Sequence, residues 1–222
     1  GYNSNPLQIA LFIAAACFYI SILFWNIAKP AFKNALLTKQ YKREIDGLKK
    51  NIQIFNALLQ DQKRINVSTE GLGIVLGNPH ARHTIVKVCN PYCGPCAIAH
   101  RAINEILESN DDIKLQIIFM VTNDKNDYRA KPVRHLMTLY EKNNPVLIRE
   151  ALDYWYGADK KDYAVFAAKD FLDGELQKQG EKFEAMNNWC NKMEISFTPT
   201  IFVNEYQLPN LYKMEDLKYL RV

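Results

Sequence analysis

Two cysteines that could carry redox chemistry flank a glycine and a proline in the sequence Cys93-Gly94-Pro95-Cys96. They follow a β-branched run and open a predicted helix over residues 97–109. A sulfur in the first turn of a helix lies beside unpaired backbone N–H groups and the positive end of the helix dipole, which favour thiolate over thiol. Cys93 is therefore the expected attacking sulfur, and Cys96, one turn further on, is the expected resolving thiol. The pair indicates thiol–disulfide exchange chemistry.

A second feature lies downstream, where residues 197–203 have the pattern of a strand entered through Pro199. X–Pro bonds alone adopt the cis form at low cost, so the Thr198–Pro199 bond is a candidate cis peptide. Either feature alone is ambiguous, because a single Cys-x-x-Cys is as often half of a zinc site and Thr-Pro-Thr is usually only a turn. Together they favour a thioredoxin fold.

The same region also raises the alternative of a metal site, since Cys89, Cys93, Cys96 and His100 spell Cys-x3-Cys-x2-Cys-x3-His. Cys89 is expected at the end of a strand, whereas Cys96 and His100 lie along a helix, so these ligands would converge only with strain. We therefore expect no metal and no other cofactor. A metal-binding chaperone or assembly factor that uses the same cysteines is the second hypothesis.

Three residues near the cysteines are candidate modulators of the site, namely Lys87, Tyr92 and His100. Either the stem of Lys87 packs while its amine reaches water, or its positive charge lowers the pKa of a cysteine. His100 is expected as a packed or solvated helix residue, with an electrostatic role as the alternative. Cys190 lies on the apolar stripe of its predicted helix and is expected as a buried thiol, and a disulfide with Cys89 is a second option in an oxidising compartment.

The elements that must position these residues follow a β-α-β order, which suits parallel pairing of the two central strands. Apolar spacing without strand-like alternation then predicts a helical insertion between the third and fourth strands. The fold class is therefore α/β. The predicted elements are strands near residues 73–76, 84–88 and 113–121, the helix at 97–109, helices within about 127–193, the strand after Pro199, a hairpin at 204–206 and a final helix containing residues 214–220.

The start of the chain has a different character. Residues 7–28 contain no charge in 22 residues, a length that crosses the ~30 Å hydrocarbon layer of a membrane as a helix. We interpret this run as a transmembrane helix, with a buried core helix or a signal-peptide segment as the alternatives. The expected domains are a transmembrane helix at 1–30, an amphipathic helical linker at 31–66 and a globular domain at 67–222.

The linker carries apolar residues in steps of three and four, the pattern of one stripe on a helix. A helix that packs on the globular domain or on itself is the first interpretation, and a coiled-coil dimer or docking on a membrane surface are the others. The stripe consists of Leu37, Tyr41, Ile45, Leu48, Ile52, Phe55 and Leu59.

Composition bounds the remaining possibilities. An apolar content of 48% is enough for a substantial core, and the net charge of +4 is small, so we expect no nucleic-acid partner.

The orientation in the membrane has two conflicting signals. Lysines after the apolar run would place the residues that follow it in the cytoplasm by the positive-inside rule. The cysteine pair instead favours an oxidising compartment. We give the cysteines more weight and expect a protein of the cell inner membrane with its redox domain in the periplasm.

From residues 73–81 through Asn90-Pro91-Tyr92-Cys93 to the C-terminus, roughly two-thirds of the sequence, the chain resembles the DsbA-like branch of thioredoxin-fold oxidoreductases. It is most similar to thioredoxin-like domains of Bacteroidetes, which follow a membrane helix or are fused to a vitamin K epoxide reductase-like membrane domain. A helical insertion between the third and fourth strands is also what distinguishes DsbA-like proteins from plain thioredoxin.

The resemblance implies a reactive Cys93, a partner Cys96 and a cis Pro199 that, with Thr198, lines a peptide-binding groove. It implies protein thiol or disulfide substrates and a membrane redox partner of the vitamin K epoxide reductase type. Lys87 stands where related domains often carry a buried acid. The direction of electron flow stays open, because the Gly-Pro dipeptide is that of reducing thioredoxins while a quinone-linked partner favours an oxidase.

Overall fold

A computed structural model describes residues 6–169 and 179–219 of the chain. The chain divides into two units, Gly1–Lys49 and Lys50–Val222, which are described separately. Helix α1 (Pro6–Lys49) makes up the first unit and is long and apolar enough to cross a membrane. The expected boundary at residue 30 between the transmembrane helix and the linker is not a break in the helix, because α1 continues through Pro30. A proline removes one helical hydrogen bond, and helix-forming residues on both sides continue the helix.

The second unit starts with a short helix, α2 (Ile52–Gln60), capped by the Asn51 side chain, which accepts hydrogen bonds from the N–H groups of Gln53 and Ile54. Phe55 and Leu59 on this helix are buried in the main core. The amphipathic stripe predicted for the linker is therefore divided between two helices. The last two residues of the stripe belong to the core of the second unit, which therefore begins before residue 67.

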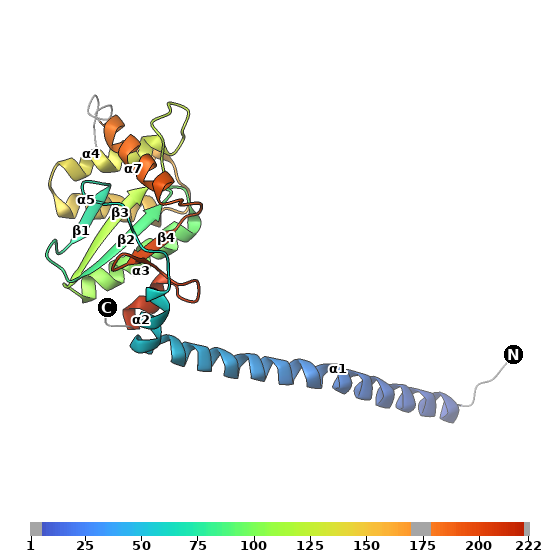
Figure 1. Cartoon of the computed structure of the whole chain (residues 1–222). Helices are drawn as coiled ribbons and strands as arrows, with labels where there is room; N and C mark the ends of the chain where they lie inside the picture. The colour runs from blue at the N-terminus through green and yellow to red at the C-terminus, as the bar shows by residue number, and fades with distance from the viewer. Residues whose placement is uncertain (1–5, 170–178, 220–222) are drawn as a thin grey trace. The chain divides into compact units, whose positions relative to one another are not determined.

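One mixed sheet forms the centre of this unit, and its strands run side by side in the order β1-β3-β2-β4-β5 (Figure 1). The central pair, β2 and β3, is parallel as the β-α-β order predicts, and the other pairs are antiparallel. A two-residue turn at Asn204-Glu205, both with positive φ, joins the predicted hairpin. The strands are β1 (Ile74–Gly77), β2 (His83–Cys89), β3 (Ile113–Phe119), β4 (Thr200–Val203) and β5 (Tyr206–Gln207).

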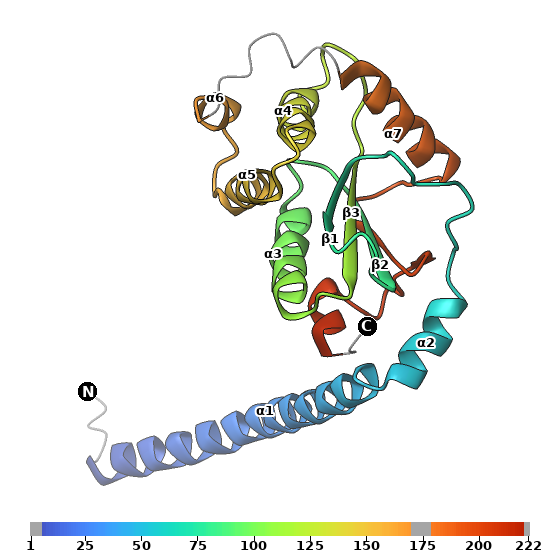
Figure 2. The same cartoon turned by 90° about the vertical axis from the view of Figure 1, so that its left-hand side faces the viewer.

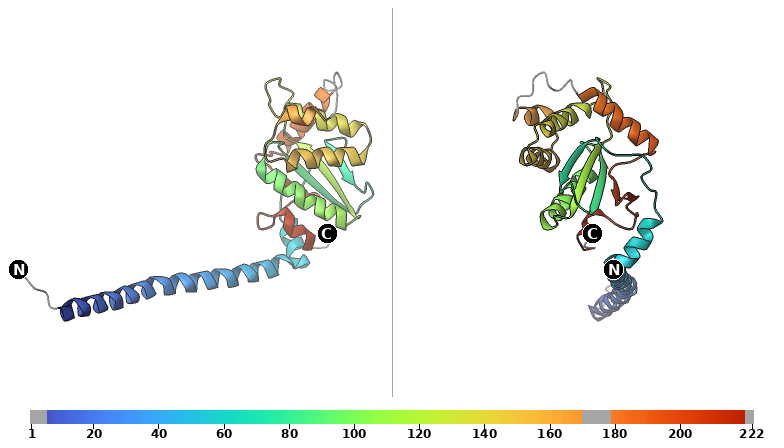
Figure 3. Two further views of the ribbon diagram at one scale, coloured as in Figure 1. Left: turned by 180° about the vertical axis from the view of Figure 1, so that it is seen from behind. Right: turned by 60° about the vertical axis from the view of Figure 1, so that its left-hand side comes forward.

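Helices cover the sheet from both sides, with α3 and α5 on one side and α7 on the other (Figures 2 and 3). Helix α3 connects the parallel strands, while α4 to α7 all lie between β3 and β4, where the helical insertion is predicted. The final predicted helix is a 3-10 turn, η2 (Met214–Tyr219), and Leu220 lies outside the described residues. The helices are α3 (Gly94–Ser109), α4 (Ala130–Glu141), α5 (Pro145–Gly157), α6 (Tyr163–Ala167) and α7 (Gly180–Lys192).

Candidate active site

Cys93 is the N-cap of helix α3 and follows β2 after the short turn 90–92. Its Sγ accepts a hydrogen bond from the N–H group of Cys96 at 3.3 Å, so the sulfur occupies the position of a capping oxygen. The Cys93 N–H group donates to the carbonyl of Asn90 at 3.1 Å, which holds the turn before the helix. Cys93 is half-buried and therefore accessible to a partner, as its predicted role requires.

Cys96 has a different environment, because its side chain is fully buried. Burial raises the pKa of the Cys96 thiol, and the neighbouring sulfurs of Cys89 and Cys93 add to the effect. In the reduced protein Cys96 is therefore a buried, protonated thiol, whereas the sulfur of Cys93 is accessible. This asymmetry fits an attacking Cys93 and a resolving Cys96.

The two sequence features that are far apart in the chain meet at Cys93. The Thr198–Pro199 peptide bond is cis, as predicted. The Thr198 carbonyl accepts a hydrogen bond from the Cys93 thiol at 3.3 Å. The Thr200 hydroxyl donates to the carbonyl of Phe197 at 2.7 Å and fixes the turn into β4. The backbone of the cis-proline loop thus lies directly against the attacking sulfur.

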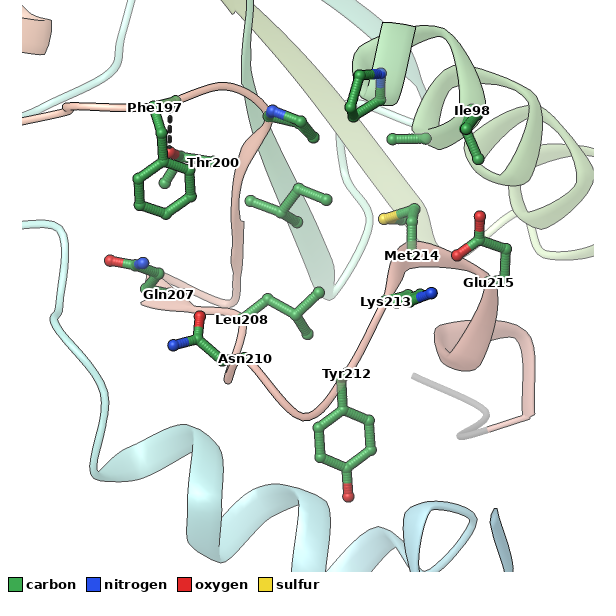
Figure 4. Close-up of a pocket in the computed structure, with 14 residues that line it drawn as sticks. Ile98, Phe197, Thr200, Gln207, Leu208, Asn210, Tyr212, Lys213, Met214 and Glu215 are labelled. Carbon is green, nitrogen blue, oxygen red and sulfur yellow. Dashed lines mark hydrogen bonds between the residues drawn. The ribbon is translucent and has the colours of Figure 1, made fainter. Parts of the chain in front are cut away.

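A largely apolar cavity of about 350 Å³ opens next to this loop. Figure 4 shows Ile98 on one side, Phe197 on the other and Leu208 between them. Ile98 and Phe197 are about half exposed, at 50% and 54% of their surface, although both are large and apolar. Such a surface beside a reactive sulfur is suited to a partner that covers it. Other lining residues are Pro95, Pro199, Tyr212, Met214 and Glu215.

The side chain of Lys87 is fully buried and interacts electrostatically with the cysteines of the site. Of the two alternatives for Lys87, the one in which its amine reaches water is therefore wrong, because Lys87 is on the central strand β2, covered on both sides. Its Nζ lies 4.6 Å from the centre of the Tyr156 ring and has no hydrogen-bond partner among the described residues. Burial lowers the pKa of the Lys87 amine, and electrostatic interaction with the sulfurs of Cys89, Cys96 and Cys93, first of all Cys89, partly opposes this shift.

Tyr156 of helix α5 connects several groups in this buried layer. Its hydroxyl lies 3.1 Å from the Sγ of Cys89, and its ring lies 4.9 Å from the His100 ring. His100 is buried, and its Nε2 lies 2.7 Å from Oδ1 of Asp153. Burial lowers the pKa of His100, partly opposed by the hydrogen bond with Asp153. His100 is therefore a packed helix residue, which is one of its two expected roles. Its ring is also paired with the carboxylate of Asp153.

The sequence does not predict Tyr156 and Asp153 as site residues. Their sequence signal is the helical spacing of Leu152, Trp155 and Tyr156, which indicates a core-facing helix and carries no link to the cysteines. Only the packing of α5 on α3 brings them to the site.

Tyr92, the third candidate modulator, belongs to an aromatic cluster beside Cys93. Its ring lies 5.1 Å from Tyr128 and 5.4 Å from Trp155. The indole N–H group of Trp155 donates to the carbonyl of Pro91 at 2.8 Å. Burial raises the pKa of the Tyr92 hydroxyl. The cluster holds the turn that leads into Cys93 and presents an exposed Tyr128 next to it.

The metal-site alternative gains no support from the described residues, in which no group of three His, Cys, Asp or Glu side chains is arranged around a common point. Cys89 is engaged with Tyr156, and His100 with Asp153. Cys89 and Cys190 are both buried free thiols in this structure, and burial raises the pKa of Cys190 to about 12.

Comparison with known proteins identifies the fold. A family model described as Thioredoxin matches residues 69–220. Solved structures with the same fold include oxidised BdbD from Bacillus subtilis, with 18% identity, a TM-score of 0.53 and coverage of 72% of this chain and 96% of BdbD. A search of curated proteins found no match.

Two further solved structures have similar scores. One is a periplasmic thioredoxin-like protein from Salmonella enterica serovar Typhimurium, with 13% identity, a TM-score of 0.55 and coverage of 76% of this chain and 94% of that protein. The other is the thiol-disulfide exchange protein alpha-DsbA2 from Wolbachia pipientis, with 13% identity, a TM-score of 0.52 and coverage of 78% and 94%. The predicted α/β thioredoxin fold with DsbA-like structural neighbours is thereby confirmed.

Proposed function

The chain belongs to the thioredoxin family, and from that premise we propose that it is a thiol–disulfide oxidoreductase acting on protein substrates. One observation carries the proposal. The accessible sulfur of Cys93 caps helix α3 and contacts the carbonyl of Thr198, while the thiol of Cys96 is buried behind it. An accessible sulfur with a second thiol one turn away is what dithiol–disulfide exchange requires.

In the reducing direction, the Cys93 thiolate attacks one sulfur of a substrate disulfide. A Cys93–substrate disulfide forms, and the first substrate thiolate leaves. Cys96 then attacks the Cys93 sulfur, which forms the Cys93–Cys96 disulfide and releases the second substrate thiolate. The substrate gains two electrons and the protein loses two. Oxidation of a substrate dithiol is the same sequence in reverse.

Thr198 and Pro199 are the proposed binding residues for the substrate backbone. The loop runs past the Cys93 sulfur, so a peptide paired with it as an added strand would bring its own cysteine to Cys93. The apolar cavity between Ile98 and Phe197 would take a neighbouring apolar side chain of the substrate.

Helix α1 supports a membrane location, and we propose that it anchors the protein in the cell inner membrane with the redox domain in the periplasm. The periplasmic relative from Salmonella enterica supports that side of the membrane. A membrane redox partner of the vitamin K epoxide reductase type, as in the Bacteroidetes domains that the sequence resembles, belongs to the same proposal.

The reduction potential of the Cys93–Cys96 pair against glutathione tests the activity and its direction together. A two-electron potential of about −270 mV would indicate a reductant, and one of about −120 mV an oxidant, on the scale of thioredoxin and DsbA. Replacement of either cysteine by alanine should abolish the two-electron couple. A wild-type protein without a measurable couple would overturn the proposed function.

A further inference from the structure

Lys87 is the least explained residue of the site. An amine with no exposed surface and no hydrogen-bond partner among the described residues is costly to bury. Its two strand neighbours in register, Ile117 on β3 and Ile201 on β4, are apolar and offer no compensation. A purely structural role would be filled better by an apolar side chain of similar length, such as methionine.

The titratable groups that face Lys87 come from three elements. Strand β2 contributes Cys89, and helix α5 contributes the ring of Tyr156. Helix α3 contributes Cys93 and Cys96, and His100, which is tied to the Asp153 carboxylate of α5. The groups that interact electrostatically with the amine are thus mainly sulfurs of the cysteine cluster.

The resolving step has a matching requirement. Cys96 must lose its proton before it can attack Cys93, yet burial holds Cys96 in the thiol form and keeps water away. Burial also favours the neutral form of the Lys87 amine, which then has a free lone pair to accept a proton. Buried lysines of this kind serve as bases in other enzymes.

We propose that the buried Lys87 amine accepts the proton of Cys96 during the resolving step, a role that rests on the oxidoreductase function proposed above. The Cys96 S–H bond breaks and an N–H bond forms on Lys87, which becomes an ammonium. The Cys96 thiolate then forms a bond to the Cys93 sulfur, and the bond between Cys93 and the substrate sulfur breaks to release a thiolate. In the reverse direction the ammonium returns its proton to Cys96 as that sulfur leaves.

Tyr156 is a positioning residue in this scheme. A cation 4.6 Å from the centre of an aromatic ring is stabilised by the electron-rich face of that ring, so Tyr156 favours the protonated Lys87 that the step generates. Its hydroxyl remains on Cys89, which keeps the ring in place.

The test separates the two sulfur steps with 5,5′-dithiobis(2-nitrobenzoate), which releases one coloured thiolate when Cys93 attacks and a second when Cys96 resolves the mixed disulfide. The full chain in detergent carries Cys17→Ser, because Cys17 is an exposed free thiol. In Lys87→Met we expect the second release to slow by about 10²-fold at pH 7, the lower end of what general base catalysis contributes. The slowed rate should rise about tenfold per pH unit, and the first release should stay within twofold of wild type.

Lys114→Met is the matched control, because Lys114 lies on the adjacent strand β3 and should leave both releases unchanged. An unchanged second release in Lys87→Met would overturn the proposal. A second release that is slower by the same factor at every pH would also overturn it, because a packing defect has no pH signature. A wild-type protein that shows no two-step release would instead overturn the oxidoreductase function itself.

A measurement on the wild type covers the case in which Lys87→Met fails to fold. The ¹³Cε resonance of Lys87, assigned in the reduced protein, should report a neutral amine at a pH where exposed lysines are still charged. Titration of Lys87 together with the exposed lysines, at about pH 10.4, would overturn the proposal.

Discussion

At the scale of single residues, the buried Lys87 amine serves the proposed proton transfer but lowers the stability of the folded protein. Below the pKa that burial lowers, the folded and unfolded states both carry the proton, and the full cost of the buried charge is present. Between that pKa and the unfolded value near about 10.4, the unfolded state binds more protons, so stability rises with pH.

Lys87→Met should therefore stabilise the protein, by at least about 1 kcal/mol in the free energy of unfolding at pH 6. The gain should shrink as pH rises toward about 10.4, where the wild-type lysine is neutral in both states. Urea unfolding of both proteins at pH 6, 8 and 10 measures this difference. A gain that is the same at all three values would mean that Lys87 is not the source of the pH dependence.

The two active-site cysteines should differ in reactivity. In a Cys17→Ser background, iodoacetamide should modify Cys93 in the Cys96→Ala variant at least about tenfold faster at pH 7 than Cys96 in the Cys93→Ala variant. The reasons are that Cys96 is fully buried and that burial raises its pKa. Mass spectrometry of the modified peptides identifies the site. Faster modification of Cys96 would reverse the two assigned roles.

The sequence predicts the cysteines and the cis-proline of this site better than the buried residues that pack against them. Cys93, Cys96 and Pro199 carry their chemistry in local spacing, and the structure brings them together. The contact of Lys87 with Tyr156 joins β2 to a helix far along the chain, and no local pattern encodes it. Of the two roles expected for Lys87, the one in which its amine reaches water is wrong, although most lysines with a packed stem do reach water.

At the scale of elements, the loop between β3 and α4 depends on one carboxylate. The Oδ2 atom of Asp127 accepts hydrogen bonds from the Thr122 N–H group at 2.8 Å and the Thr122 hydroxyl at 2.9 Å. Its Oδ1 accepts one from Nε of Arg129 at 2.7 Å. Burial alone would raise the pKa of Asp127, but these bonds together lower it to about 2. The loop presents Tyr128 to the Tyr92 ring beside Cys93.

Asp127→Asn should lower the free energy of unfolding by about 2 kcal/mol at pH 7, because the unfolded carboxyl titrates near 3.8 and the folded one near 2. This contribution is present above the unfolded pKa and is lost as pH falls through the folded one. The difference between variant and wild type should therefore shrink between about pH 4 and pH 2. Urea unfolding across that range measures it, and a pH-independent difference would contradict the assignment to the charge.

The order and type of the strands and helices around the site follow closely from the sequence. The boundaries of the helices before the globular unit do not. Strand β2 and helix α3 are predicted because a β-branched run and a capped helix are local patterns. The helix does not end at the expected boundary near residue 30, since it tolerates the one hydrogen bond that Pro30 removes. The division of the amphipathic stripe at Lys49 depends on which apolar residues find the core, which is a tertiary property.

At the scale of the whole molecule, the boundary of the redox unit has a measurable consequence. The segment before residue 67 contributes two kinds of contact to the globular unit. Phe55 packs edge-on against Tyr212 at 5.0 Å. The backbone also pairs with the β4–β5 hairpin, where the N–H group of Ile65 donates to the carbonyl of Glu205 at 2.8 Å. The hairpin leads from the cis-proline loop, so this segment supports one wall of the site.

A fragment that starts at Lys50 should fold without α1 and keep the exchange activity, since the first unit contributes no buried residue. A fragment that starts at Val67 should be less stable by about 3 kcal/mol or more, because it leaves the space of Phe55 and Leu59 unfilled and the edge beside Glu205 unpaired. Urea unfolding of the two fragments compares their stabilities, and reduction of a protein disulfide compares their activities. Phe55→Ala in the longer fragment is the matched control and should account for most of the loss, because it removes the core contact but keeps the backbone pairing. Equal stability of the two fragments would place the boundary at residue 67, where the sequence pattern puts it, and would make α2 an accessory to the redox unit.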